Sequence, residues 1–305
     1  MDIIEKTKSL VERHLSDVTI ERFEKLLRSK SYLLKNEIKN YFLALNKDEI
    51  EPEIAEIINY FEKYRFSIYP YEYQRNYHTK DITVYYDKAV KMLYVLHNNK
   101  RLYFPQYMGK EMVRRYYNLL RKEQDENSPH RYETNDFTVK DGDIIADIGA
   151  AEGIWALDNV EKAGKIYLFE CNDKWVKALK RTFEPWKEKV FIVNKYVSNI
   201  NREEYITLDD FFEGETIDFI KADIEGMEIN LLEGSKELLK RETNLKLLLC
   251  TYHRKNDAES IKKTLEAKGY KIEYSKRYMI FIIDKELDEP YIRRGIIRAS
   301  KNANP

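Results

Sequence analysis

Two different spacings of apolar residues divide this chain. Between residues 2 and 64, apolar positions recur at helical spacing with lysine and glutamate between them, as in the series Ile54, Ile57, Ile58 and Phe61. We therefore expect a mainly helical leader. Strand-like runs come next, at residues 82–87, 91–97 and 101–105. Asn98 and Asn99 tolerate positive φ, so they predict a hairpin turn between the last two of these runs.

From Asp143 onward, short apolar runs alternate with amphipathic helical segments. The runs lie at residues 143–148, 165–170, 190–194, 217–223, 245–252, 271–275 and 278–283. The helical segments between them lie at residues 152–163, 173–184, 227–240 and 258–268. This alternation predicts an α/β fold with a seven-stranded, mostly parallel, doubly wound sheet. Only a few residues separate the last two runs, which we expect to form an antiparallel hairpin at the edge.

The polar segment at residues 123–137 is the best candidate for a domain boundary. It follows a helical segment at 110–122 and precedes the first strand of the predicted sheet. We divide the chain into a mainly helical N-terminal domain with a small β-hairpin region, a sheet domain and a C-terminal tail, at residues 1–125, 126–290 and 291–305. The tyrosine-rich stretch at 60–86 is interpreted as core or oligomer interface rather than as a glycan platform.

The composition indicates a folded protein without an overall charge bias. Hydrophobic residues make up 43% and aromatics 13% of the 305 residues, and 53 lysines and arginines balance 53 aspartates and glutamates. The balance disfavours a nucleic-acid binder, although a local basic groove would not show in it. Two cysteines, Cys171 and Cys250, indicate neither a disulfide framework nor a zinc site. Since no long apolar run or signal core occurs, we expect no membrane span and a cytoplasmic location.

The turn after the first run of the sheet domain predicts a cofactor site. It places Asp147, Gly149 and Gly153 around two alanines, Ala150 and Ala151, which leave room beside the glycines for a tight turn or a close ligand. Glu170 ends the next run, about 20 residues further on, where a carboxylate accepts hydrogen bonds from both ribose hydroxyls. These positions predict an adenosine ligand.

The acids of this loop distinguish between two adenosine cofactors. A dinucleotide site needs G-x-G-x-x-G, so that a pyrophosphate sits on the helix amides, and this loop has only two glycines, four residues apart. Asp147 and Glu152 would repel a pyrophosphate, whereas they favour the ammonium and sulfonium of S-adenosylmethionine. The alternative is purely structural, with Glu170 as a solvated strand end and Asp147 as a turn cap.

Two further segments carry a more specific pattern. They read ITLDDFF at residues 206–212 and IDFIKADIEGME at 217–228, followed by LLEG at 231–234. With the loop and Glu170, they resemble the FkbM family of methyltransferases over roughly residues 126–283. The resemblance implies a Rossmann-like methyltransferase fold that transfers methyl from S-adenosylmethionine to a hydroxyl of a sugar, glycan or glycosylated metabolite. By position it implies cofactor contacts at Asp147, Gly149, Glu152, Gly153 and Glu170, and an acidic motif at Asp223, Glu225 and Gly226.

Several residues around this motif complete the expected cofactor contacts. We add Ala150 and Ala151 of the loop, Cys171 (where the family usually has proline), Asn194 after the third strand, and Asp223.

The acceptor side is expected where the fourth and fifth strands end. Asp223 follows the fourth strand and His253 the fifth, so both face the crevice in which open α/β sheets place their chemistry. We favour His253 as the general base, Asp223 as the residue that positions it or the acceptor, and His130 as a lid or substrate contact. A structural role is the alternative for each histidine.

Three other interpretations stay open at this point. Asp223, Glu225 and Glu228 could hold Mg²⁺, but this is the less favoured interpretation because acids at a helix start are stabilised without a metal. Methylation of RNA or protein, or a catalytically silent nucleotide-binding assembly protein, are the alternatives to a small-molecule or glycan acceptor. The N-terminal domain is expected to bind substrate or to form a homo-oligomer.

Overall fold

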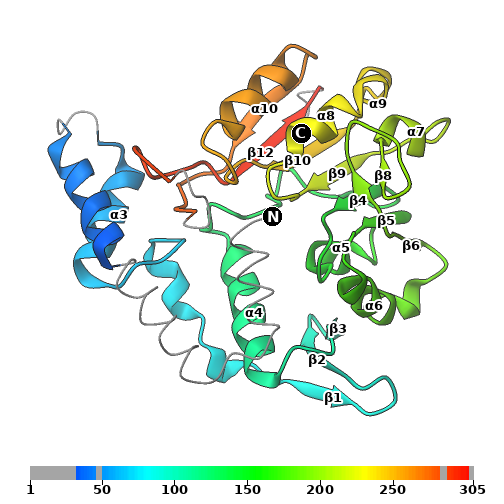
Figure 1. Cartoon of the computed structure of the whole chain (residues 1–305), viewed down its shortest axis with the longest axis horizontal. Coiled ribbons are helices and arrows are strands. Elements are labelled where there is room, and N and C mark those ends of the chain that lie inside the picture. The colour runs from blue at the N-terminus through cyan, green and yellow to red at the C-terminus, as the bar shows by residue number, and fades with distance from the viewer. Residues whose placement is uncertain (1–31, 46–49, 282–286, 302–305) are drawn as a thin grey trace. The chain divides into compact units, whose positions relative to one another are not determined.

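The computed structural model describes residues 32–45, 50–281 and 287–301. The chain forms two compact units (Figure 1). The first unit contains the described residues before Tyr73 together with those of 277–293, and the second contains 73–276 and the residues from Arg294 onward. These bounds differ from the segments predicted at 1–125, 126–290 and 291–305, because the first unit interrupts the second. What the N-terminal part does stays a prediction.

The described part of the first unit confirms the expected helical spacing, while residues 2–31 and 46–49 of the predicted helical leader lie outside the described ranges. Residues 32–44 are helical, and α3 (Pro52–Lys63) buries the predicted apolar series Ile54, Ile57, Ile58 and Phe61. The described residues 278–281 of the apolar run predicted at 278–283 also belong here, and residues 282 and 283 lie outside the described ranges. Met279 pairs with Arg293 in an isolated antiparallel bridge, and Ile280 donates its N–H to the carbonyl of Ile68. Its prediction as the last strand of the large sheet is therefore wrong.

The second unit is built on a seven-stranded sheet in the order β11-β12-β10-β9-β4-β5-β6. The strands are β4 (Ile144–Ile148), β5 (Lys165–Phe169), β6 (Val190–Val193), β9 (Phe219–Ala222), β10 (Lys246–Cys250), β11 (Lys271–Tyr274) and β12 (Ile296–Ser300). All are parallel except β12, which runs antiparallel between β10 and β11. The predicted mostly parallel α/β sheet is confirmed, with its antiparallel strand supplied by residues that were assigned to the tail.

The two faces of the sheet have different partners. One face packs against α7 (Leu208–Phe211), α8 (Glu228–Glu233), α9 (Lys236–Arg241) and α10 (Asp257–Glu266) in a single apolar core. On the other face, Phe219 of β9 contacts the rings of Phe137 and of Trp155 in α5 (Ile154–Asn159). This second face carries the polar side chains Asp147 and Lys221. Successive side chains of a strand point to opposite faces of the sheet. The sheet therefore has an apolar core on one face and a polar site on the other.

The helix predicted over 227–240 is two helices. The chain breaks between α8 and α9 at Gly234, where an added Cβ would lie 2.1 Å from the carbonyl oxygen of Ser198. Ser198 follows the short strand β7 (Tyr196–Val197), which pairs with β8 (Tyr205–Ile206). Gly234 therefore lets the backbone of Ser198 approach closely at the point where α8 ends.

A small antiparallel sheet precedes the large one within the second unit. Its strands are β1 (Tyr85–Asp87), β2 (Met92–His97) and β3 (Lys100–Phe104), and α4 (Lys110–Glu123) follows. Asn98 and Asn99 have φ of 48° and 65°, which confirms the predicted hairpin turn. The backbone N–H of Tyr103 donates to Thr182 at the end of α6 (Asp173–Thr182). Short 3-10 helices lie at Glu72–Asn76, Thr79–Asp81 and Glu184–Trp186. No helix within the described ranges is long and apolar enough to cross a membrane.

Candidate functional site

The predicted cofactor loop folds back onto the end of β5. The backbone N–H groups of Gly149 and Ala150 each donate to the carbonyl of Phe169 at 3.0 Å. Glu170 accepts from the N–H of Ala151 at 2.8 Å and from that of Asn172 at 2.7 Å. Burial raises the pKa of Glu170, although these two hydrogen bonds lower it. The carboxylate is thus fixed at the carboxyl edge of the sheet.

A pocket opens at this edge between the ends of four strands. Its lining is mostly apolar or aromatic around the single carboxylate of Glu170, and it consists of Ile148, Gly149, Phe169, Glu170, Cys171, Lys195, Tyr196, Val197, Ser198, Tyr205, Ile224 and Met227. Each carboxylate oxygen of Glu170 accepts one backbone hydrogen bond and has a second lone pair that can accept another from a ligand. A carboxylate beside apolar walls is the chemistry that ribose hydroxyls and an adenine need, but the pocket encloses only about 80 Å³ and would have to widen to take a whole adenosine.

Some predicted cofactor residues lie outside this pocket lining. Glu152 is buried and accepts a hydrogen bond of 2.9 Å from the hydroxyl of Tyr116 in α4, and burial raises its pKa to about 7. Gly153 has a φ of 77° and packs against Leu179 of α6. Asn194 donates to Asp173 at 2.6 Å. Glu152 therefore connects the loop to α4, a partner that sequence spacing did not indicate.

Asp147 forms a buried ion pair with Lys221. The two residues are paired on the adjacent strands β4 and β9, and the Nζ of Lys221 lies 2.8 Å from Oδ1 of Asp147 and 3.2 Å from the carbonyl of Gly149. Burial lowers the pKa of Lys221, but Asp147 and Asp223 outweigh it and hold the ammonium charged. Lys221 thereby connects two strands to the backbone of the cofactor loop.

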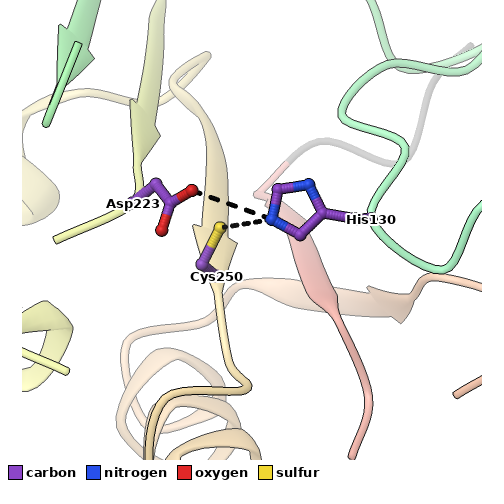
Figure 2. Close-up of side chains that lie close together, drawn as sticks. All are labelled: His130, Asp223 and Cys250. Atoms are coloured by element: carbon purple, nitrogen blue, oxygen red, sulfur yellow. Dashed lines mark hydrogen bonds and ion pairs between the residues drawn. The ribbon is translucent and has the colours of Figure 1, made fainter. Parts of the chain in front are cut away.

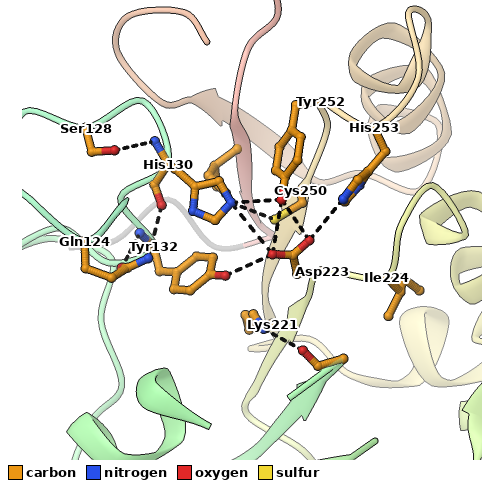
Figure 3. A network of polar contacts seen from close by, with 12 residues as sticks. Gln124, Ser128, His130, Tyr132, Lys221, Asp223, Ile224, Cys250, Tyr252 and His253 are labelled. Carbon is orange, nitrogen blue, oxygen red and sulfur yellow. Dashed lines mark hydrogen bonds and ion pairs between the residues drawn. The ribbon is translucent and has the colours of Figure 1, made fainter. Parts of the chain in front are cut away.

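Asp223 is the centre of a polar network beyond the end of β9 (Figure 3). Tyr132 and Tyr252 donate to its carboxylate, each at 3.1 Å, and the Nε2 of His253 lies 3.3 Å away. Burial raises the pKa of Asp223, but the hydrogen bond and the charge of His253 lower it more, to well below its usual range. Because the side chain is still 20% exposed, an ionised carboxylate faces an accessible part of the site.

His253 lies between two carboxylates. Its Nε2 is 3.3 Å from Asp223, and its Nδ1 is 3.2 Å from Glu228 at the start of α8. Burial lowers its pKa, yet the two acids raise it to about 10. At neutral pH both ring nitrogens carry protons, so this histidine holds the acids in place. A charged imidazole cannot accept a proton, which disfavours His253 as the general base, and that role stays a prediction.

His130 has the opposite character. It is 2% exposed, and its Nε2 lies 3.1 Å from the hydroxyl of Tyr252, 3.8 Å from the Sγ of Cys250 and 3.7 Å from Asp223 (Figure 2). Burial lowers its pKa to about 4, so the imidazole is neutral at pH 7. The structure thus brings His130 to Asp223, and its role as a lid or substrate contact stays a prediction.

The segment around His130 is fixed by the antiparallel strand β12. Arg298 is 3% exposed and donates to the carbonyls of Tyr132 at 2.9 Å and Arg131 at 2.5 Å. Gly295 lies so close that an added Cβ would come within 2.2 Å of the carbonyl of Pro129. Sequence reasoning missed Tyr132, Tyr252 and Arg298. Tyr252 could have been found as the neighbour of His253, but Arg298 lies in a segment that was assigned to the tail.

The acidic motif does not fit Mg²⁺. Among the described residues, two groups bring potential ligands within 4.8 Å of one another, namely His130 with Asp223 and Cys250, and Asp223 with Glu228 and His253. Neither is the oxygen-only set that Mg²⁺ prefers. Glu225, the third acid of the expected set, has a φ of 56° and belongs to neither group.

A second, polar pocket of about 680 Å³ shares Tyr132 with this network. Four aromatic residues and many hydrogen-bonding groups line it, namely Tyr77, Tyr117, Tyr132 and Trp155 with His97, Asn98, Arg121, Gln124, Arg131, Glu133, Thr134, Asn135, Thr138, Asp158, Asn159 and Lys162. Tyr132 forms part of this lining, while its hydroxyl reaches Asp223.

Part of the chain matches a known protein family. Residues 178–272 match the profile described as the methyltransferase FkbM domain. No curated protein matches the chain. A solved methyltransferase FkbM from Methylobacillus flagellatus KT is 16% identical, covers 62% of this chain and 53% of its own, and has a TM-score of 0.43. This chain therefore spans about half the length of that protein.

Two further solved structures are similar at the same level. Precorrin-6y C5,15-methyltransferase from Geobacter metallireducens GS-15 is 16% identical over 53% of this chain and 81% of its own, with a TM-score of 0.38. Fibrillarin from Aeropyrum pernix, solved with natively bound S-adenosyl-L-methionine, is 17% identical over 53% of this chain and 67% of its own, with a TM-score of 0.35.

Proposed function

Residues 178–272 belong to the FkbM methyltransferase domain family, and on this premise we propose that the chain is an S-adenosylmethionine-dependent O-methyltransferase. Its proposed acceptor is a hydroxyl of a sugar, glycan or glycosylated metabolite. The observation that carries this proposal is the ionised, partly exposed Asp223 beside the glycine loop: a Cβ on Gly149 would lie 2.1 Å from the carbonyl oxygen of Asp223.

The cofactor half of the proposal rests on the pocket around Glu170. Its carboxylate would hold the ribose hydroxyls, and the walls formed by Tyr196, Ile224 and Met227 would enclose the adenine. When bound there, S-adenosylmethionine supplies an electrophilic methyl group. The acids at Glu170 and Asp223 favour its positive charges, as they would not favour a pyrophosphate.

The hydrogen bond from the acceptor hydroxyl is assigned to Asp223, and the released proton to neutral His130, because a carboxylate whose pKa lies well below its usual range is a weak base. Methyl transfer forms an oxygen–carbon bond as the sulfur–carbon bond of the donor breaks, and it leaves a thioether and releases the hydroxyl proton. The chain therefore needs an accessible group that aligns the hydroxyl and a neutral base beyond it. Asp223 is ionised and partly exposed, whereas His253 is protonated and His130 is buried. His253 then acts by keeping Asp223 ionised and oriented. His130, neutral beside Tyr252, is the next acceptor along the network.

The acceptor half of the proposal is supported by the polar pocket that Tyr132 lines. Aromatic rings among amide, carboxylate and guanidinium groups suit a sugar, which presents apolar ring faces and many hydroxyls. Tyr132 belongs to both the pocket and the Asp223 network. A hydroxyl of a sugar bound on that side would thus approach the carboxylate.

Calorimetric titration tests the cofactor. We expect micromolar binding of S-adenosylmethionine and S-adenosylhomocysteine and none of NAD. Glu170→Gln should weaken binding of the two methyl-transfer ligands, because a neutral amide is a poorer partner for the ribose hydroxyls. Glu213→Gln, at an exposed acid that lines none of the pockets described above, is the matched control. Binding of NAD but not of the methyl donor would overturn the proposal.

Turnover assays with sugar, RNA and protein acceptors test the chemistry. Asp223→Asn should lower turnover by about 10²- to 10⁴-fold and leave cofactor binding intact, since it removes the charge that aligns the acceptor hydroxyl but keeps the shape of the side chain. Methylation of RNA or protein in preference to every glycan would replace the proposed acceptor. Cofactor binding without methylation of any sugar, RNA or protein acceptor would favour a catalytically silent nucleotide-binding assembly protein.

A further inference from the structure

A basic groove lies between α6 and the small sheet, within the second unit. It encloses about 620 Å³ and is lined by Val90, Met92, Gln106, Tyr107, Lys174, Lys177, Lys180, Arg181 and Glu184. None of these residues lines the pocket around Glu170 or the polar pocket that contains Tyr132. The groove is therefore a separate site from the one proposed for methyl transfer, and an inference about it does not depend on that proposal.

Positive charge outweighs negative charge along the groove. Its lining holds four cations of α6 and a single acid, Glu184, which pairs with Arg181 at 3.3 Å. Within the part of the chain that the structure describes, Lys177 and Lys180 form no ion pair. Like charges three and four residues apart on a helix repel one another. An anion bound in the groove would remove this repulsion.

A row of tyrosines on the small sheet leads toward the groove. Tyr85, Tyr94 and Tyr103 lie directly opposite one another across β1, β2 and β3, with ring centroids 5.2 and 5.3 Å apart. Tyr103 packs with Met92 and with Ala178 of α6, so this row of rings is on the face of the sheet that meets the groove. At the outer end of the row, Tyr85 is 39% exposed, and Tyr107 in the groove lining is 48% exposed.

We propose that this surface binds a single-stranded nucleic acid. The phosphates lie along Lys174, Lys177, Lys180 and Arg181, and bases stack on the exposed rings of Tyr85 and Tyr107. A positive groove flanked by aromatic side chains is the arrangement that binds single strands without sequence preference, because every base has a planar face. A phosphorylated glycan would also use the cations, but its puckered sugar rings cover the face of a tyrosine less completely than a planar base does. The zero net charge of the chain is compatible with this site, since the positive charge is concentrated locally.

Fluorescence anisotropy with a labelled oligouridylate tests the proposal on the full-length protein. Four cations on single-stranded phosphates predict a slope of log K against log salt concentration of about −3, at about −0.7 per phosphate. Lys177→Gln with Lys180→Gln should reduce that slope by about 1.4 and weaken binding. The matched control is Lys262→Gln with Lys263→Gln on α10, which should bind like the wild type. None of these four lysines is buried, so thermal unfolding should be unchanged.

Tyrosine variants and competitors separate a nucleic-acid strand from other polyanions. Tyr107→Ala and Tyr85→Ala should each weaken binding at least about fivefold, the lower end of the range for loss of one stacked base. Inorganic polyphosphate and a phosphorylated mannan should compete poorly. No binding at 50 mM salt (about one third of physiological strength), or equal losses in the α10 control, would overturn the proposal. Wild-type binding by both tyrosine variants, or equal competition by polyphosphate or the glycan, would overturn it too, in favour of a general anion site or a glycan site.

Discussion

Gly149 is packed against the backbone of Asp223, so closely that a Cβ at residue 149 would lie 2.1 Å from the Asp223 carbonyl oxygen. This contact joins the loop of the expected cofactor site to the residue at the centre of the polar network. Any side chain at residue 149 would push the two apart, in addition to the cost of its positive φ of 73°.

Gly149→Ala is therefore expected to destabilise the protein by more than about 1 kcal/mol, because a positive φ and a backbone clash act together. The variant should also lose affinity for S-adenosylmethionine. Gly214→Ala is the matched control, since Gly214 has a φ of 77° but no atom within 4 Å of the position that a Cβ would take. Urea unfolding and calorimetry measure both effects. Equal unfolding free energies for the two variants would show that the contact with Asp223 does not matter.

Lys221→Met should lower the free energy of unfolding by about 3–5 kcal/mol, because it leaves Asp147 buried without its partner. Adding Asp147→Leu removes the second charge, so the double variant is expected to be more stable than Lys221→Met alone. Urea unfolding of both variants provides the measurement. If the two substitutions destabilise additively, the ion pair is not the reason for the loss.

Stability is expected to fall as the pH rises from about 7 to 10 because of His253. The pKa of this histidine rises from 6.5 to about 10 in the folded chain, so its contribution to stability is complete below pH 6.5 and is lost as the pH approaches 10. For one proton the slope is about 1.4 kcal/mol per pH unit. His253→Gln should flatten the dependence, whereas His78→Gln, at an exposed histidine, should retain it. Parallel curves for wild type and His253→Gln would contradict this assignment.

Arg298→Met should lower turnover by about 10²-fold while the dissociation constant for S-adenosylmethionine stays unchanged, because the segment that carries His130 and Tyr132 loses its anchor. Lys271→Met, at an exposed residue of the neighbouring strand β11, is the control. Steady-state kinetics and calorimetry provide the two readouts. A loss of cofactor affinity equal to the loss of turnover would mean that Arg298 supports the whole sheet rather than this segment.

The predicted strands agree with the structure where the apolar run is buried in the sheet itself. Six of the seven predicted runs became strands of the large sheet, because an apolar run between amphipathic helices has few other places to be buried. The seventh failed for a specific reason. Met279 and Ile280 are as apolar as any strand of the sheet, but they are buried in the other unit. Periodicity indicates that a run is buried but not which partner buries it.

The sequence by itself determined six strands of the large sheet, the glycine loop, Glu170 at the end of β5 and Asp223 at the end of β9. These features depend on neighbours in the chain and on the rule that parallel strands end at one edge. The tertiary structure alone decided the protonation of the histidines, the partner of Asp147 and the strand that completes the sheet. Those depend on charges and backbone groups that lie far apart in the sequence, such as Glu228 beside His253 and Arg298 beside Tyr132, and burial makes their interactions strong.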